Sequence, residues 1–311
     1  MGCFFVTNIF ALTNSNLNHI ERKNLIIDDA GRKLIVQKPF KRIISLYGAH
    51  TENLFSLGLD EEIIGVSRNE EYPKKVLGKK VFSYHDDSEK FLAASPDLVL
   101  IRPMIDRGYS QLMRRLEQFG ITVVSLQPGT VEEMFAYWKM LGKLSGKEEK
   151  AIEMIEYFKN NVLFFKSLAS VLTNKKNVYF ESIHRKMKTF SSDSMAIYAL
   201  ETAGGINIAD DAKPSRNTNI AVYGKEKILS HAKEIDIYLS QYGTMNRATK
   251  EMIKNTSGFK IIKAIETDQV YIIDERIVSR PTLRLLNGIF EIGRILYPDI
   301  FNHQQIPGGY H

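Results

Sequence analysis

Short apolar runs alternate with amphipathic segments over the first half of the chain. Two apolar runs flank the turn Asp28-Asp29-Ala30-Gly31, which predicts a β-hairpin at residues 25–36. Further apolar runs predict a strand after Pro39 and strands at residues 63–67, 80–82, 98–101 and 121–126. Helical spacing predicts helices that end at Gly58 and Gly120 and a helix that begins at Glu89. This alternation indicates β-α-β units and a parallel sheet.

The second half repeats the alternation after a long helical stretch. Residues 130–172 contain no Pro and no alternating strand pattern, so they predict helix. Beyond them we predict strands at residues 177–181, 235–239 and 270–273 and helices at 193–203 and 283–296. The predicted fold class is therefore α/β, with two doubly wound, Rossmann-like lobes connected by one long α-helix. The expected parts are a signal remnant or linker, an N-terminal lobe, a connecting helix and a C-terminal lobe, at residues 1–23, 24–146, 147–173 and 174–311.

One pattern occurs once in each predicted lobe. At Glu89 the sequence reads E-K-F-L-A-A-S-P-D-L-V-L-I, and at Glu226 it reads E-K-I-L-S-H-A-K-E-I-D-I-Y-L. In both copies a carboxylate opens a short helical turn, a polar break follows, and an apolar strand ends the unit. Two similar lobes joined by a helix are a usual design for a protein that closes on a ligand.

The composition indicates a solvated surface without the clustered basic residues that are typical of nucleic-acid-binding proteins. Of 311 residues, 44% are hydrophobic and 25% are charged, which suffices for two lobes with cores of their own. The net charge of +6 comes mostly from lysines scattered along the chain, with no block of basic residues. We therefore expect no nucleic-acid partner.

The single cysteine, Cys3, excludes an internal disulfide and a cysteine-based zinc site. It opens an apolar run at residues 3–12 that is too short to span a bilayer. Three interpretations of this segment stay open. It is the remnant of a secretion signal, the end of a lipoprotein cleavage box with lipid on Cys3, or an N-terminal strand or frayed end.

Known catalytic motifs do not occur in the sequence. There is no G-x-S-x-G, no H-E-x-x-H, no P-loop and no G-x-G-x-x-G after a strand. Ala203-Gly204-Gly205 ends a predicted helix, which is the wrong context for phosphate binding. We therefore expect no enzyme and no catalytic residues.

Seven segments occur in a recognisable order, from residue 42 to residue 298. They read R-I-I-S-L-Y-G-A-H-T-E-N-L-F-S-L-G, I-I-G-V-S, E-Y-P, S-P-D-L-V-L-I, G-I-T-V-V-S-L, V-Y-I-I-D-E and L-N-G-I-F-E-I-G-R-I-L-Y-P. Together they resemble the substrate-binding proteins of iron-siderophore, haem and vitamin B12 ABC importers, which form class III of the periplasmic binding proteins. The similarity covers roughly residues 24–301 and implies two lobes joined by one rigid helix.

The resemblance implies that ligand lies at the C-terminal ends of the strands. The corresponding loops of this chain are residues 47–50, 102–109, 127–130, 182–188, 241–247 and 276–284. The implied ligand-binding residues are Tyr47, His50, Arg102, Arg107, Tyr109, His184, Arg185, Tyr242 and Arg280. Arg247 and Arg284 lie in the same loops, and so many guanidinium groups favour an anionic ligand.

Each of these side chains also has a structural alternative. A loop arginine is often a solvated charge or part of a local salt bridge. His50 is also placed to cap a helix or to be partly buried, and His184 is similar. The tyrosines are also candidates for packing, although planar ligands favour aromatic walls. Met104, Met187 and Met245 are expected to fill gaps rather than to contact metal.

Glu89 and Glu226 align with the two acidic residues with which vitamin B12-binding members of the family meet basic pockets on their permease. A dimeric permease presents two equivalent sites, so two similar lobes can each offer one carboxylate. The structural alternative is that each carboxylate only supplies negative charge to a helix N-terminus.

The resemblance implies an extracytoplasmic solute-binding protein that delivers a metal chelate to an ABC importer. Its expected partners are a permease dimer with its ATPase. Its expected location is periplasmic, or lipid-anchored on the outer face of the cytoplasmic membrane, and a monomer is expected. No intrinsic cofactor is expected, because the iron or cobalt chelate is the ligand. A ferric siderophore ranks first, ahead of a corrinoid and of haem bound through His50, His184 or a tyrosine. Whether side chains ligate the metal directly stays open, and a ligand-sensing receptor subunit is the alternative of a different class.

Overall fold

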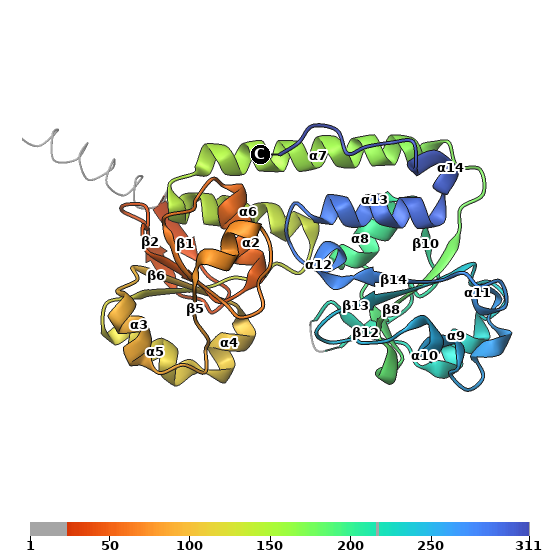
Figure 1. Cartoon of the computed structure of the whole chain (residues 1–311), viewed down its shortest axis with the longest axis horizontal. Helices are drawn as coiled ribbons and strands as arrows, with labels where there is room; N and C mark the ends of the chain where they lie inside the picture. The colour runs from red at the N-terminus through yellow and green to blue at the C-terminus, as the bar shows by residue number, and fades with distance from the viewer. Residues whose placement is uncertain (1–23, 216–217, 311) are drawn as a thin grey trace, which may run out of the picture. The chain divides into compact units, whose positions relative to one another are not determined.

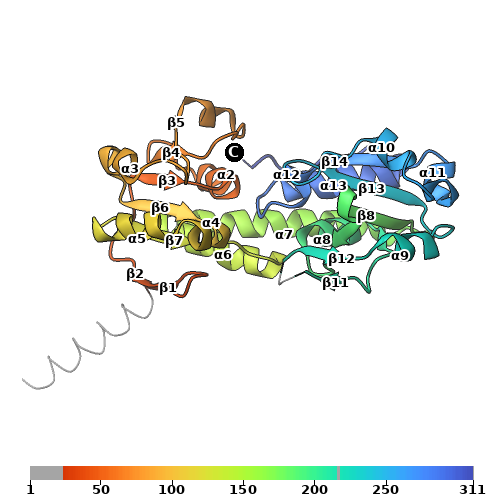
Figure 2. The same cartoon turned by 90° about the horizontal axis from the view of Figure 1, so that it is seen from below.

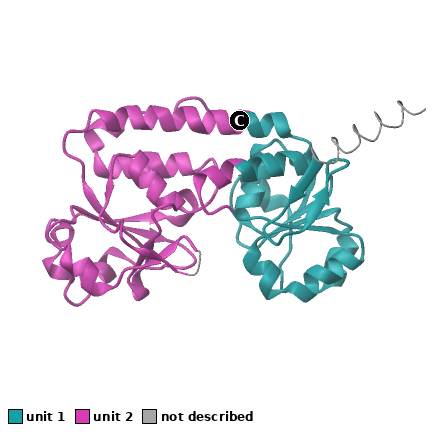
Figure 3. Cartoon of the chain, turned by 180° about the vertical axis from the view of Figure 1, so that it is seen from behind, with its two compact units in different colours: residues 1–127, 136–152 teal, residues 128–135, 153–311 magenta. Residues whose placement is uncertain are grey.

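The computed structural model describes residues 24–215 and 218–310 (Figure 1). The predictions about Cys3 and residues 3–12 lie outside the described residues. The chain splits into two compact units (Figure 3): unit 1 holds the residues up to 127 and residues 136–152, and unit 2 holds residues 128–135 and those from 153 onward. This division runs through helices α6 (Val131–Ser145) and α7 (Glu148–Ser170). The lobe limits expected at residues 146 and 173 therefore stay a prediction.

Unit 1 is built on a five-stranded parallel sheet in the order β5-β4-β3-β6-β7, which can be followed strand by strand in Figure 2. The strands are β3 (Ile43–Ser45), β4 (Ile63–Val66), β5 (Lys80–Val81), β6 (Leu98–Ile101) and β7 (Thr122–Ser125). The helical connections are α2 (Gly48–Ser56), η1 (Lys74–Gly78), α3 (Ser88–Ala94), α4 (Pro103–Gly108) and α5 (Ser110–Gln118). The chain runs outward from β3 to β5 and then crosses to β6, so the strand order reverses between β3 and β6.

Burial on both faces explains why the strands of unit 1 read as continuous apolar runs. Every residue of β3 and β6 is buried. Phe82 and Phe91, whose ring centroids lie 5.1 Å apart, join Ile44, Val99 and Met113 in one core cluster.

A two-stranded antiparallel hairpin, β1 (Leu25–Ile27) and β2 (Lys33–Ile35), precedes the sheet at the predicted place. Its turn is tied to the C-terminal end of β7. The Asp28 carboxylate accepts a hydrogen bond from the Ser125 amide at 2.9 Å, and the Asp29 carboxylate accepts one from the Gln127 amide at 2.6 Å.

Unit 2 contains a mixed sheet in the order β11-β12-β9-β8-β13-β14, with β10 also paired to β8. Its strands are β8 (Asn177–Ile183), β9 (Lys188–Phe190), β10 (Ile206–Asn207), β11 (Lys213–Pro214), β12 (Ile220–Val222), β13 (Ile237–Tyr242) and β14 (Val270–Asp274). Strands β8, β10, β13 and β14 run parallel, whereas β9, β12 and β11 are antiparallel additions that the sequence analysis does not predict. They are too short for a visible period of two.

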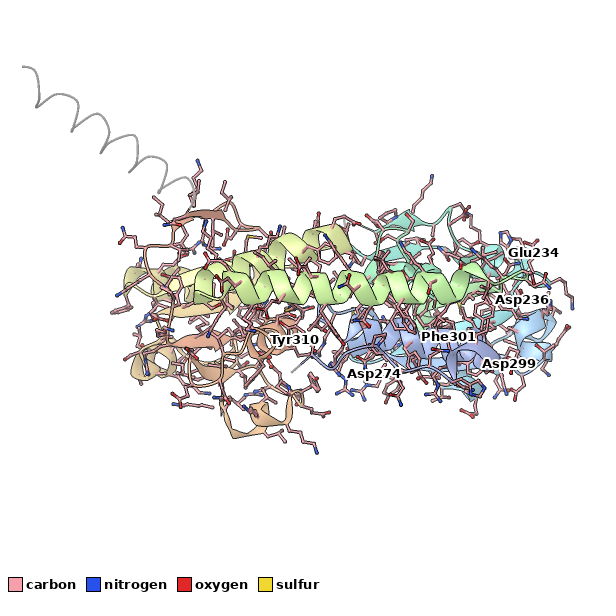
Figure 4. All side chains as sticks on the ribbon, turned by 90° about the horizontal axis from the view of Figure 1, so that it is seen from above. Glu234, Asp236, Asp274, Asp299, Phe301 and Tyr310 are labelled. Carbon is pink, nitrogen blue, oxygen red and sulfur yellow. The ribbon has the colours of Figure 1, made fainter. Side chains whose placement is uncertain are left out.

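The helices of unit 2 surround its sheet and continue into the C-terminal tail. They are η2 (His184–Lys186), α8 (Met195–Thr202), α9 (Lys225–Ser230), α10 (Lys250–Lys254), η3 (Phe259–Ile261), α11 (Lys263–Glu266), α12 (Glu275–Val278), α13 (Leu285–Leu296) and α14 (Pro298–Phe301). Phe301 stacks on Phe165 of α7, and the ring centroid of Tyr310 lies 5.3 Å from that of Tyr157. Phe301 and Tyr310 are labelled in Figure 4.

The predicted α/β fold class is confirmed, and the repeated sequence pattern takes the same place in both sheets. Helix α3 leads into β6, which pairs with the first strand of its sheet, β3. Helix α9 leads into β13, which pairs with the first strand of its sheet, β8. Within the described residues, no helix combines the length and the apolar character needed to cross a membrane.

Candidate functional site

The reversal of strand order in unit 1 brings together two residues predicted to contact ligand. Tyr47 follows β3 and Arg102 follows β6, each at the position that precedes a helix. The Arg102 guanidinium carbon lies 5.0 Å from the centroid of the Tyr47 ring. In open α/β sheets, the crevice at the C-terminal ends of two strands that diverge in this way is the usual binding site. Tyr47 and Arg102 thus form the centre of a candidate half-site in unit 1.

His50 lies inside unit 1 and not at its surface, and its contact with ligand stays a prediction. Its side chain is fully buried. Nδ1 lies 2.6 Å from the Tyr137 hydroxyl and Nε2 lies 2.9 Å from the Ile101 carbonyl oxygen. Asn53 donates to the same hydroxyl, so Tyr137 donates to Nδ1 and Nε2–H donates to Ile101. His50 is therefore a neutral structural residue beneath the half-site.

Burial lowers the pKa of His50 from its ordinary value of 6.5 to about 4, against the opposing effect of the Ile101 hydrogen bond. Between these two values the unfolded chain binds a proton that the folded chain does not bind. Stability from this group is complete above pH 6.5 and falls as the pH is lowered to 4, by about 3 kcal/mol in total. We expect urea titrations to show this loss in the wild type and a smaller loss in His50→Gln. Parallel pH profiles for the two proteins would contradict the assignment.

An aromatic group that the sequence analysis only partly anticipated lies at the same edge of the unit 1 sheet. Tyr84 and His85 follow β5, and Tyr109 follows α4. The Tyr84 ring centroid lies 4.6 Å from that of His85 and 4.6 Å from that of Tyr109. Only Tyr109 was predicted as a site residue. The signal for the other two was their place directly after a predicted strand, at residues 80–82.

Arg32 of the β1–β2 hairpin forms an ion pair with helix α4, which lies in the predicted ligand loop at residues 102–109. Its guanidinium donates to Asp106 of α4 at 2.8 and 2.7 Å, to Asp28 at 3.0 Å, and pairs with Glu117 of α5 at 2.8 Å. The hydrogen bond to Asp106 is the main cause of the raised pKa of Arg32. The hairpin therefore holds two of the predicted ligand loops, residues 102–109 and 127–130. Arg107 is exposed in the last turn of α4.

The corresponding edge of unit 2 has buried His184 and exposed Arg185. Only 6% of His184 is exposed, and its Nδ1 lies 2.8 Å from Oε1 of the fully buried Glu181. Its Nε2 lies 3.1 Å from the Thr256 hydroxyl. Both ring nitrogens of His184 therefore have partners within the protein, and its contact with ligand stays a prediction. Arg185 is exposed in η2.

Glu181 and His184 belong to one buried hydrogen-bond network. Oε1 of Glu181 accepts from the Tyr238 hydroxyl at 2.6 Å, and its Oε2 accepts from the Ser240 hydroxyl at 2.8 Å. The Thr256 hydroxyl donates to the Met252 carbonyl oxygen at 2.9 Å and lies 3.1 Å from Nε2 of His184. The network therefore fixes the side chain of His184 at both ring nitrogens.

A second cation–π contact lies after β13 in unit 2. The Arg247 guanidinium carbon lies 5.8 Å from the centroid of the Tyr242 ring, and both residues are exposed. Asn246 joins this loop to the loop at residues 182–188. Its side chain accepts from the His184 amide at 3.1 Å and donates to the Gln241 carbonyl oxygen at 2.7 Å. Each unit thus presents an arginine over a tyrosine beside its pair of central strands.

The third predicted ligand loop of unit 2, residues 276–284, is held more strongly by surrounding residues than the loops at residues 182–188 and 241–247. Arg276 pairs with Asp274 at 2.8 Å across the first turn of α12. Arg280 and Arg284 are half-buried, between α12 and α13. Arg280 stays a predicted ligand residue, whereas Arg276 is in a local ion pair.

Glu89 and Glu226 are both exposed in the first turn of a short helix, α3 and α9 respectively. The Arg115 guanidinium donates to Glu89 at 2.7 Å, and the Ser88 hydroxyl donates to it at 3.1 Å. A hydrogen bond from its own backbone N–H lowers the pKa of Glu89, with the Ser88 hydroxyl adding to the effect. Both carboxylates are available to a partner surface.

Over residues 24–215 and 218–310, no group of three or more His, Cys, Asp or Glu side chains is placed to hold a metal ion.

Comparison with known proteins finds relatives that match along most of the chain. The family model described as "Periplasmic binding protein" matches residues 43–277. The uncharacterized ABC transporter substrate-binding lipoprotein YvrC of Bacillus subtilis is 25% identical in an alignment of 291 positions that covers 88% of this chain and 86% of that protein. The vitamin B12-binding protein of Vibrio campbellii is 27% identical in an alignment of 272 positions that covers 86% of this chain and 92% of that protein. A solved structure, described as a possible iron-binding (periplasmic solute-binding) protein from Staphylococcus epidermidis, matches with a TM-score of 0.73 and 29% identity over 84% of this chain and 100% of that one.

Proposed function

Because this chain belongs to the periplasmic binding protein family, we propose that it binds a metal chelate outside the cytoplasm and delivers it to an ABC importer. It is a solute-binding protein and not an enzyme, since the family and the relatives that match along most of its length are binding proteins. Its partners would be a permease dimer and the associated ATPase. It would work in the periplasm or as a lipid-anchored protein on the outer face of the membrane.

The arginine–tyrosine pairs carry this proposal. A guanidinium that lies over a tyrosine ring keeps its edge N–H groups directed outward, where they suit carboxylate or catecholate oxygens. Arg102 on Tyr47 supplies one such group in unit 1, and Arg247 on Tyr242 supplies one in unit 2. Arg185 adds a further exposed guanidinium. An anionic ferric siderophore is therefore our first candidate ligand.

A corrinoid is the second candidate, because relatives named as vitamin B12-binding proteins match over most of this chain. Haem is less well supported, since His50 and His184 are buried with both ring nitrogens engaged. The proposed ligand set is Tyr47, Arg102, Arg107, Tyr109, Arg185, Tyr242, Arg247 and Arg280. Protein purified from its native host should carry the absorption spectrum and the metal of its ligand, which distinguishes the three classes.

Removing two arginines tests the charge of the ligand. We expect Arg102→Ala combined with Arg185→Ala to weaken binding of an anionic ferric chelate by about 100-fold or more, because each charge-assisted hydrogen bond contributes about 1.5 to 3 kcal/mol. Isothermal titration would measure the change. The matched control combines Arg114→Ala and Arg294→Ala, which remove one exposed helix arginine from each unit. Undiminished binding of a neutral or cationic chelate to the first variant would refute the electrostatic argument.

A further inference from the structure

The β1–β2 hairpin of unit 1 carries apolar side chains on both of its faces. Leu25 pairs with Ile35 and Ile27 pairs with Lys33 across the ladder, so these four side chains share one face, the outer face. Ile26 lies on the opposite face and is only 4% exposed, which places that face against unit 1. On the outer face, Leu25, Ile27 and Ile35 are 38%, 53% and 44% exposed.

An outer face of this kind departs from the usual pattern of an antiparallel sheet. A face that meets solvent normally carries polar side chains, whereas here only Lys33 is polar. Leu25 and Ile35 are direct cross-strand neighbours, so the exposed apolar surface is continuous from β1 to β2. Figure 2 shows the hairpin at the margin of unit 1. Continuous apolar surface rimmed by polar residues is typical of contact with a protein or a membrane.

The contacts that fix the hairpin also leave it with an excess of positive charge on its outside. Asp28 and Asp29 accept hydrogen bonds of 2.9 and 2.6 Å from backbone amides at the end of β7. Arg32 pairs with carboxylates of α4 and α5 at 2.7 and 2.8 Å. The other charged residues between positions 25 and 38 are Lys33 and Lys38, and both are exposed. The outer face is therefore a rigid surface that combines aliphatic side chains with lysine.

This combination fits a lipid surface better than a protein surface. Protein interfaces are enriched in aromatic side chains and arginine, and lysine is depleted in them. The outer face has three aliphatic side chains, one lysine and no aromatic residue. At a bilayer, aliphatic side chains enter the boundary between headgroups and acyl chains, while lysine amines reach anionic headgroups. Arg22 and Lys23, which precede the hairpin in sequence, add to the basic character of this stretch.

The place of the hairpin in the chain favours the same partner. The described residues begin at Asn24, directly before β1. The apolar run at residues 3–12 and Cys3 lie upstream, and in the proposed function this part of the chain is the one attached to the membrane. An extended chain spans at most about 3.6 Å per residue, so the distance from residue 12 to residue 24 is at most roughly 40 Å. The hairpin is thus the first described element that such an attachment brings near the bilayer.

Resting on the proposed function, which holds the chain at the outer face of the cytoplasmic membrane, we propose that the outer face of the hairpin binds the surface of an anionic lipid bilayer. Leu25, Ile27 and Ile35 enter the headgroup boundary, and Lys33 and Lys38 pair with headgroup phosphates. A second contact on the same surface strengthens the attachment, because it forms within a complex that already exists. This contact uses no residue of the proposed ligand set.

A fluorescent label on the outer face tests the contact directly. Cys3 is the single cysteine, so Cys3→Ala combined with Ile27→Cys gives one labelling position in the full chain. An environment-sensitive fluorophore there should shift its emission to shorter wavelength when phosphatidylcholine–phosphatidylglycerol vesicles are added, and brominated acyl chains should quench it. The matched control is Val222→Cys in the same background, because Val222 of β12 is 54% exposed and Ile27 is 53% exposed. The control label should keep its emission.

Substitutions on the outer face should weaken binding of the full chain to the same vesicles. We expect Ile27→Ser combined with Ile35→Ser to lower the partition coefficient by at least about tenfold. Lys33→Gln should lower it by about fivefold for the anionic vesicles and leave it unchanged for pure phosphatidylcholine. Val81→Ser combined with Val222→Ser replaces one exposed strand residue in each unit and should behave as the wild type. Equal partition of the outer-face variants and this control would overturn the inference.

The label also identifies any other molecule or segment that covers the outer face. Short-wavelength emission in the free protein at every protein concentration would show that the chain itself covers residue 27. A shift that depends on protein concentration alone would show that a second copy covers it. Either result, or a label that does not respond to vesicles, overturns the inference.

Titration with a ferric catecholate separates this inference from the proposed function. The outer-face variants should bind that complex as the wild type does, because none of their substitutions lies in the proposed ligand set. Loss of the vesicle response with intact catecholate binding overturns the membrane contact alone. A vesicle response in a wild type that binds no ferric chelate would instead contradict the proposed ligand and support the contact.

Discussion

Replacing Glu181 by Ala is expected to lower the free energy of unfolding by about 3 to 5 kcal/mol, which is a large part of the stability of a typical domain. The change leaves Nδ1 of the buried His184 without its partner and removes the acceptor of the Tyr238 and Ser240 hydroxyls. Denaturant titration followed by circular dichroism would measure the loss. We also expect weaker ligand binding, since His184 and Asn246 hold the two loops that carry Arg185 and Arg247.

The chain contains a matched control for this variant. His231 and Glu234 form a second histidine–glutamate pair three residues apart, at 3.3 Å, with 35% and 60% of their side chains exposed. Glu234 lies at the surface of unit 2 (Figure 4). Glu234→Ala should change stability by less than about 1 kcal/mol, because water replaces the lost partner. Similar losses for both variants would show that Glu181 is not the buried carboxylate described here.

Replacing Glu89 and Glu226 together by Ala is expected to abolish transport and to leave ligand affinity nearly unchanged. Both carboxylates are exposed on helices that lead into a central strand, and neither belongs to the proposed ligand set. Charge pairs at a protein interface show coupling energies of about 1.5 to 7 kcal/mol, so the loss of two would prevent productive docking. Uptake of labelled chelate and titration of the purified variant would measure the two properties separately.

The control for docking uses carboxylates in equivalent helix positions. Glu149 and Glu251 are exposed in the first turns of α7 and α10, one in each unit. A Glu149→Ala, Glu251→Ala protein loses the same helix-terminal charge and should transport normally. Loss of transport in this control, or loss of ligand binding in the Glu89 and Glu226 variant, would contradict the docking role.

The parallel core could be predicted from sequence because its signal is local. Strands β6 and β14 lie within a residue of their predicted limits, since each contains an uninterrupted apolar run, and every residue of β6 is buried. Strands β9, β11 and β12 were not predicted. They have two or three residues each, and their pairing depends on partners elsewhere in the sheet.

The roles of the histidines could not be predicted, because distant partners determine them. His50 is neutral and buried owing to Tyr137, which is 87 residues away in sequence. Glu181, which is close to His184 in sequence, pairs with it. Glu181 is itself held by a hydrogen bond from Tyr238, which is 57 residues further along the chain. His85 contacts the hydroxyl of Tyr109, which is 24 residues later in sequence.

The hairpin that holds α4 and β7 has a consequence for the order in which the polypeptide acquires its structure. Residues 25–35 are synthesised before the rest of unit 1, yet the Asp28 carboxylate closes a contact with Ser125, 97 residues downstream, and Arg32 closes one with Asp106, 74 residues downstream. Contacts over such separations form late, because the entropy of closing the intervening chain has to be overcome first. The amino-terminal hairpin therefore waits for β7, the last strand of the five-stranded sheet, and a nascent chain shorter than about 125 residues cannot fix it in place.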